Sequence, residues 1–94
     1  MPTEMLNPAH PGRILRGWLS GMNITHVARH IGVSRVSLSK ILNCRGGISA
    51  EMSLRLSAAL GTSPSFWFDM QTNYEFAQAK RKKLPKIVKL PTAA

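Results

Sequence analysis

Several residue classes are scarce in this 94-residue chain, and each scarcity excludes a class of protein. Cys44 is the single cysteine, which excludes an intramolecular disulfide framework and a zinc site built on cysteines. No apolar run approaches the roughly 18 residues of a membrane span. The first twelve residues lack the basic start and apolar stretch of a secretory signal. We therefore expect a cytoplasmic protein with no membrane contact.

Acidic residues are also scarce, because four Asp and Glu stand against 13 Lys and Arg, for a formal net charge of +9. No acid occurs between Met5 and Ala50, whereas residues 51–79 have a slight excess of acids and residues 80–94 carry six bases. An ordinary helical surface mixes both signs, so the first half indicates a face for a polyanion. The alternative is that the charges only interact with solvent and bind no partner. That interpretation fits residues 80–94 better than it fits the first half of the chain.

The pattern of turns and apolar residues predicts an all-α fold of five short helices with little strand signal. Cap residues, glycines and prolines bound them. We expect an N-terminal arm over residues 1–9, a compact helical domain over 10–79 and a basic tail over 80–94. The five helices are expected from His10-Pro11 to Gly21, from an N-cap at Thr25 to Gly32, from an N-cap at Ser34 to about Asn43, from an N-cap at Ser49 to Gly61, and from Ser63-Pro64 to about Lys83.

Apolar residues at helical spacing predict the core. A chain of this length builds one core and has no room for a large enclosed active site. The expected buried positions of the first four helices are Ile14, Leu15, Trp18, Leu19, Val27, Ala28, Ile31, Leu38, Ile41, Leu42, Leu56, Ala59 and Leu60.

The fifth helix carries two apolar stripes. One consists of Phe66, Trp67, Met70, Tyr74 and Ala77, which fit one face turned to the core. The other consists of Phe68, Phe76 and Ala79 and would be exposed in a monomer, which predicts a dimer interface. Cover by residues 1–9 is the alternative.

The last stretch, residues 84–91, is bounded by prolines that prevent the helix from continuing. Its Ile87-Val88 pair fits either a short edge strand or part of a disordered basic tail.

Helices two and three have the spacing of a helix-turn-helix, in which the second helix enters a DNA major groove. The turn between them is only Gly32-Val33-Ser34, and Gly32 must take a left-handed conformation. Leu38 and Ile41 anchor the third helix. Its other face is left free, and that face carries Arg35, Val36, Ser37 and Lys40.

Each residue of the free face has a possible role in the groove. Arg35 can bond a guanine edge with two hydrogen bonds, and Val36 can pack on a thymine methyl group. Ser37 and Lys40 can contact bases or phosphates. Backbone phosphates would pass the ends of the motif, where the sequence places Thr25, Ser34, Asn43 and Arg45.

The same residues carry a family resemblance. Residues 28–35 (ARHIGVSR) and 38–43 (LSKILN) are similar to the Cro/C1 (XRE-type) helix-turn-helix family. More narrowly, residues 7–12 (NPAHPG), 47–56 (GISAEMSLRL) and 58–67 (AALGTSPSFW) resemble the HigA/VapI-type antitoxins. The likeness covers about residues 7–78.

The resemblance implies a homodimer that binds double-stranded operator DNA in its own promoter, in the bacterial cytoplasm and associated with the nucleoid. It also implies a partner toxin, a HigB-type ribonuclease that cleaves mRNA. Motif positions would make the base-contacting set Arg35, Val36, Ser37, Ser39 and Lys40. The family commonly has acids where Arg13, Gly17 and Trp18 stand here, and a glycine where Cys44 stands.

Other functions have less support in the sequence. His26 and His30 lie one turn apart but lack a third metal ligand, and Cys44 has no base or orienting acid beside it. We expect no metal, no cofactor and no enzymatic activity. Three other binding roles stay open: an RNA- or ribosome-associated protein that uses residues 80–89, a module for an acidic protein partner, and a helix-turn-helix regulator without a toxin.

Overall fold

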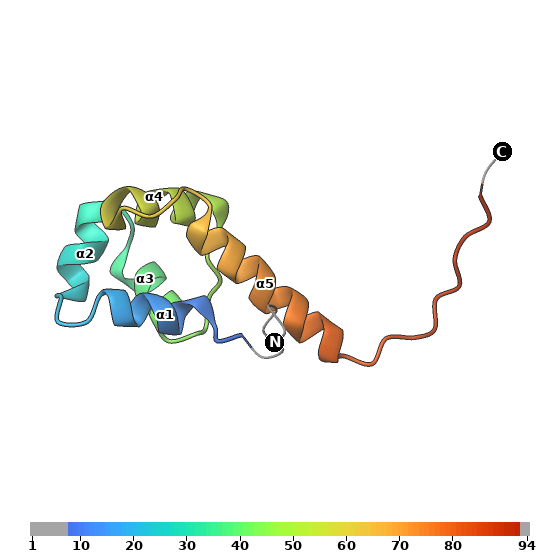
Figure 1. Cartoon of the computed structure of the whole chain (residues 1–94). Helices are drawn as coiled ribbons and strands as arrows, with labels where there is room; N and C mark the ends of the chain where they lie inside the picture. The colour runs from blue at the N-terminus through green and yellow to red at the C-terminus, as the bar shows by residue number, and fades with distance from the viewer. Residues whose placement is uncertain (1–7, 93–94) are drawn as a thin grey trace, which may run out of the picture.

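Five α-helices and no strand make up the regular structure of residues 8–92, which are the residues that this computed structural model describes (Figure 1). The expected all-α fold is therefore confirmed. Residues 1–7 of the expected arm lie outside the described range, as do residues 93 and 94. The helices are α1 (Pro11–Trp18), α2 (Ile24–Ile31), α3 (Arg35–Leu42), α4 (Ala50–Leu60) and α5 (Phe66–Arg81).

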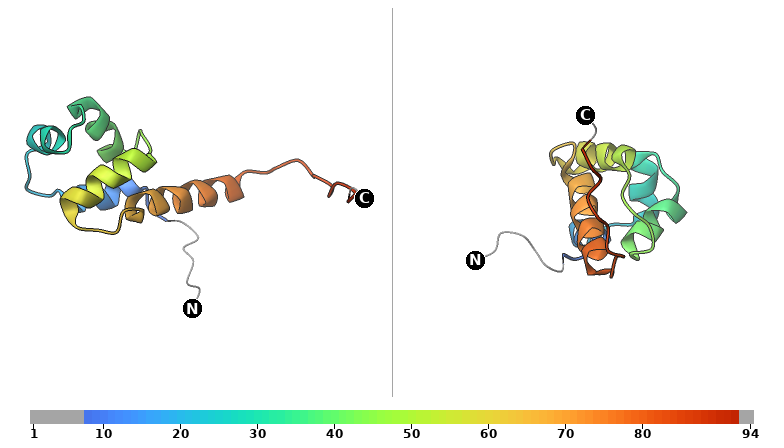
Figure 2. Two further views of the ribbon diagram at one scale, coloured as in Figure 1. Left: turned by 90° about the horizontal axis from the view of Figure 1, so that it is seen from above. Right: turned by 90° about the vertical axis from the view of Figure 1, so that its right-hand side faces the viewer.

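The helices α1 to α4 form the body of the molecule, and α5 starts within that body and extends out of it. Figure 2 shows the second half of α5 and the extended segment after it pointing away from the other four helices. The segment from residue 82 to residue 92 is exposed and has no regular structure, so of the two alternatives for Ile87-Val88 the edge strand is absent from this single chain.

Helix starts follow from side chains that accept backbone N–H groups. Ser34 accepts from the N–H of Ser37, and Ser49 from that of Met52, as expected. At the start of α1 the cap is His10, whose Nδ1 accepts from the N–H of Gly12 at 2.9 Å. Burial lowers the pKa of His10, which keeps the imidazole neutral and its Nδ1 free to accept.

Two expected starts are wrong. Asn23, not Thr25, caps α2, because its Oδ1 accepts from the N–H of His26 at 3.0 Å and the helix begins two residues earlier than expected. Helix α5 begins at Phe66, since Pro64 lies in a turn before the helix. Two helix ends also differ from the expected ones. Helix α1 ends at Trp18 rather than at Gly21, and α5 ends at Arg81 rather than at about Lys83.

The core lies where α1, α3, α4 and α5 meet. Leu15, Leu38, Leu56 and Trp67 are each 0% exposed, and they come from these four helices in turn. Trp67 packs edge-on against Phe66 and Trp18, with ring centroids 5.0 and 5.7 Å apart. The buried positions expected for α2 and α3 are confirmed, with Val27 partly buried.

The apolar patterns predicted for α1 and α4 were only partly correct, whereas those of α5 are confirmed. Ile14 and Trp18 are 40% and 45% exposed, and Ala59 is exposed, because each lies at the edge of its stripe rather than at its centre. The stripe of Phe66, Trp67, Met70, Tyr74 and Ala77 is buried or half-buried, as expected. The second stripe, Phe68, Phe76 and Ala79, is exposed in this chain.

Helices α1 and α3 touch through their backbones at Gly12. A Cβ atom placed on Gly12 would lie 1.8 Å from the carbonyl oxygen of Ile41, a distance that no side chain can occupy. The contact therefore requires glycine for space rather than for its dihedral angles. It sets how closely the two helices approach.

We predict that Gly12→Ala lowers the free energy of unfolding by about 3 kcal/mol, because the methyl group must push α1 away from α3. Gly17→Ala is the matched control in the same helix, where a Cβ would meet nothing within 4 Å. It should raise stability by about 0.5–1 kcal/mol through helix propensity. Chemical denaturation measures both, and equal effects of the two changes would contradict the assigned role of Gly12.

Candidate nucleic-acid interface

The turn between α2 and α3 has the predicted backbone. Gly32 is left-handed, with φ 78° and ψ 31°, and the N–H of Val33 returns to the carbonyl oxygen of Ala28 at 3.0 Å. Val33 is half-buried against the core. The two helices are therefore held at an angle by a three-residue turn, as a helix-turn-helix requires.

Arg55 of α4 contacts this turn and stabilises it. Its Nη1 donates to the carbonyl oxygen of Ile31 at 2.7 Å, and its Nε and Nη2 donate to the carboxylate of Glu51 at 3.2 and 2.9 Å. A cation at a helix C-terminus stabilises the carbonyls that have no partner within the helix. Sequence reasoning missed Arg55. The spacing of Glu51 and Arg55 indicates an ion pair, but nothing in the sequence indicates the contact with Ile31.

Helix α3 has a buried inner face and an exposed outer face. Leu38, Ile41 and Leu42 are buried, whereas four of the five residues expected to contact bases are exposed: Arg35, Val36, Ser37 and Lys40. The fifth, Ser39, is half-buried and turns toward the side of the helix that faces α1. The outer face thus presents a guanidinium, an ammonium, a hydroxyl and a branched apolar side chain.

The residues expected to contact phosphates surround this face. Ser34 caps α3 and donates its hydroxyl to Ser37 at 2.9 Å, and Thr25 is exposed in the first turn of α2. Asn43 follows the last residue of α3, and Arg45 is exposed in the loop beyond it. These positions agree with the expected layout, and the contacts with DNA themselves stay predictions.

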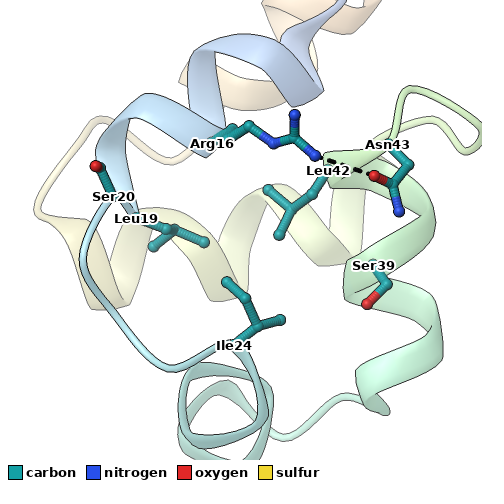
Figure 3. A pocket seen from close by; sticks show the side chains of 7 residues that line it. All are labelled: Arg16, Leu19, Ser20, Ile24, Ser39, Leu42 and Asn43. Atoms are coloured by element: carbon teal, nitrogen blue, oxygen red, sulfur yellow. Dashed lines mark hydrogen bonds between the residues drawn. The ribbon is translucent and has the colours of Figure 1, made fainter.

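Asn43 has a further partner that sequence reasoning did not identify. Its Oδ1 accepts from Nη2 of Arg16 at 3.0 Å, across 27 residues of sequence (Figure 3). Figure 3 shows both residues at the rim of a pocket whose volume is about 300 Å³. Arg16 therefore brings a cation from α1 to the C-terminal end of α3.

Cys44 has an unusual backbone in the loop after α3. Its φ is 60°, and no other residue except glycine has a positive φ within residues 8–92. Its N–H bonds the carbonyl oxygen of Ile41 at 3.0 Å, which closes the end of the helix. The left-handed region suits glycine, so a glycine at this position would adopt the observed backbone without steric cost.

The positive charge of α1, α2 and α3 is not neutralised locally. Within residues 8–92 the one ion pair is between Arg55 and Glu51, and both partners lie in α4. The bases of the first three helices therefore project a positive potential that attracts a polyanion.

No group of three His, Cys, Asp or Glu side chains suited to a metal occurs among the residues with described positions. No helix of that part of the chain is long and apolar enough to cross a membrane.

The chain matches known proteins in sequence and in structure. Residues 13–67 match the helix-turn-helix family. Virulence-associated protein A′ of Dichelobacter nodosus is 39% identical over 89 residues, which cover 92% of this chain and 77% of that protein.

Two solved structures are similar as well. Antitoxin HigA of Pseudomonas aeruginosa with the higBA promoter is 37% identical, with a TM-score of 0.74 and coverage of 78% of this chain and 83% of that one. Antitoxin GraA in complex with its operator is 34% identical, with a TM-score of 0.75 and coverage of 95% and 99%.

We predict that Cys44→Gly raises the free energy of unfolding by about 1 kcal/mol, because glycine adopts the left-handed conformation without steric cost. The thiol is exposed, so little packing is lost. Cys44→Ala keeps the strain and should give no such gain. Thermal unfolding of the two variants tests the prediction, and equal stabilities would contradict it.

Proposed function

This chain belongs to the helix-turn-helix family, in the XRE-type group that includes the HigA antitoxins, and we propose that it is a sequence-specific repressor of its own promoter. The observation that carries the proposal is the outer face of α3. Arg35, Val36 and Lys40 are exposed there, on a helix whose opposite side is fully packed. Such a helix fits the major groove of double-stranded DNA.

The proposed base contacts are those of the exposed face together with Ser39 at its edge. Arg35, near the start of α3, would bond guanine, and Val36 would pack on thymine. Thr25, Ser34, Asn43 and Arg45 would hold phosphates on either side. The similar antitoxins HigA and GraA, seen with promoter and operator DNA, support this arrangement.

A homodimer is part of the proposal. Phe68 and Phe76 are 40% and 63% exposed on α5, and Ala79 is exposed near the end of the same helix. Burial of these side chains against a second copy would remove apolar surface from water. A symmetric dimer would recognise a palindrome with half-sites about 34–36 Å apart, or a multiple of that distance.

The antitoxin role is a separate part of the proposal. The chain would bind and neutralise a partner toxin, an mRNA-cleaving ribonuclease of the HigB type. Its support is the similarity to proteins named antitoxins. A regulator without a toxin partner is the alternative, and both roles place the chain with DNA in the bacterial cytoplasm.

The direct test is binding to the DNA immediately upstream of the chain's own coding sequence, against a scrambled duplex, at two salt concentrations. A large preference for the upstream duplex is expected. Equal, salt-sensitive binding to both duplexes would contradict a specific repressor and favour RNA or an acidic protein as the partner.

We predict that Arg35→Ala weakens binding to the cognate duplex by about 1–3 kcal/mol and relaxes the preference at one base pair, because a bidentate contact with guanine is lost. Arg13→Ala removes the same charge from α1 and should leave the base preference intact. Titration against duplexes with single base changes measures both. An unchanged preference in Arg35→Ala would contradict the role of α3.

We predict that deletion of residues 82–94 weakens binding to all duplexes and lowers the dependence of affinity on salt, because four lysines are lost while α5 stays whole. Deletion of residues 90–94 is the control, since that segment holds no charged side chain. The slope of log affinity against log salt is the measurement. Identical slopes would show that the lysines do not contact DNA.

A further inference from the structure

Helices α1 and α5 run in opposite directions and contact each other at both ends of α1 (Figure 1). At the C-terminal end of α1 the ring of Trp18 meets that of Phe66, with centroids 6.4 Å apart. At the N-terminal end the ring of His10 meets that of Tyr74, with centroids 4.8 Å apart. Both contacts are edge-on, and together they fix how α1 lies against α5.

The side chains between these two contacts form an exposed apolar patch. Ile14 lies midway along α1 and Met70 midway between the two α5 rings, so the opposite directions of the helices place them alongside each other. Ile14 and Trp18 are 40% and 45% exposed, and Phe66 and Met70 are half-buried. We call these four residues the α1–α5 patch.

The patch holds more apolar surface than the core of one chain covers. Leu15 and Leu19 fill the inner side of α1 and are 0% and 3% exposed, whereas Ile14 and Trp18, which the apolar spacing assigned to the core, face solvent on the side of α5. Contact with another apolar surface would remove these side chains from water.

The two edges of the patch carry opposite charges. Arg13 precedes Ile14 and is exposed on the outer side of α1, and Asp69 follows Phe66 by one turn and is exposed on α5. Neither charge is paired among the residues with described positions, since the one ion pair there lies within α4. A two-fold axis through the patch would set the basic edge of each copy against the acidic edge of the other, so the surface is complementary to itself.

We propose that the α1–α5 patch is a self-association surface, whose partner is the same patch of a second copy of this chain. It is distinct from the α5 stripe of the proposed homodimer, because Phe68 comes two residues after Phe66 and therefore lies about 200° further around the helix. Each chain can thus use one surface within a dimer and the other between dimers.

The small size of the patch indicates what the contact does. Four apolar side chains are far fewer than the roughly 20–30 residues that each partner contributes to a stable interface. The contact is therefore weak between free dimers and becomes effective between dimers that one DNA duplex holds close together, because the duplex raises their local concentration. This cooperative step rests on the proposed operator binding, whereas self-association of the free protein does not.

The first experiment is sedimentation equilibrium of the full chain, at concentrations up to about 1 mM to detect a weak contact. Tetramers should form from dimers as the concentration rises. Arg13→Asp and Asp69→Arg should each weaken this step about tenfold, because each sets like charges against each other. The variant with both changes should regain most of the loss, since opposite charges face each other again. Arg29→Asp makes the same charge change on α2, outside the patch, and should have no effect.

Two apolar changes separate the patch from the α5 stripe. Ile14→Gln should abolish the association of dimers and leave the dimer intact. Phe76→Gln should abolish the dimer of the α5 stripe and leave association through the patch unchanged. Circular dichroism at the assay temperature shows whether each variant is folded, and the paired charge changes test the patch without altering a buried side chain.

The second experiment compares duplexes that carry the upstream DNA once or twice, with the two copies set whole helical turns apart. The natural protein should occupy the doubled duplex about tenfold more tightly per site than the single one. Arg13→Asp should remove this gain, and the variant that also carries Asp69→Arg should restore it.

The outcomes distinguish this proposal from the proposed function. If the free protein forms nothing larger than a dimer, or if the two charge changes do not compensate each other, the patch proposal is overturned and the repressor stands. If Phe76→Gln keeps the dimer and Arg13→Asp weakens it, the patch is itself the dimer interface and the α5 stripe is wrong. If the charge changes compensate but the upstream duplex is not preferred, the repressor is overturned and the self-association surface stands.

Discussion

The arrangement of this molecule depends on the backbone contact between α1 and α3 at Gly12. There the carbonyl oxygen of Ile41 fills the space that any side chain would need. Because the contact brings α1 directly onto the inner side of α3, Leu15 and Leu38 are completely buried beside it. The same approach lets Arg16, one turn later on α1, reach Asn43 at the end of α3. A single close contact thus fixes the inner face of α3 and leaves its outer face in solvent.

Two arginines contact the ends of the two helices of the helix-turn-helix. Arg55 bonds the carbonyl oxygen of Ile31 at the end of α2, and Arg16 bonds Asn43 at the end of α3. Both contacts lie where a helix ends and its last carbonyl groups or its cap require partners. Arginine suits this role because several N–H groups diverge from one rigid plane. Arginine side chains in this protein therefore stabilise the fold as well as contribute to the proposed interface.

Local chemistry could be predicted from the sequence, and contacts between distant segments could not. Ser34, Ser49 and Gly32 were identified correctly because a cap or a left-handed turn depends on one or two neighbouring residues. Asn23 and Thr25 are both good caps two residues apart, and propensity alone cannot choose between them. The edge residues Ile14 and Trp18 show that periodicity gives the centre of an apolar stripe but not its width. At the site, the exposed face of α3 could be predicted from its period, whereas Arg16 and Arg55 could not, because their partners are 27 and 24 residues away.

The outer face of α3 contributes nothing to the core, and this separation has a consequence for how the protein can change over generations. Substitutions at exposed positions away from caps and buried contacts usually alter stability by less than about 0.5 kcal/mol. Val36, which is 65% exposed, and Lys40 lie at such positions. A lineage can therefore replace these side chains one at a time and remain folded throughout. Recognition of new DNA sequences is open to gradual evolution on this scaffold, while Gly12, Gly32 and Arg55 are held in place by the fold.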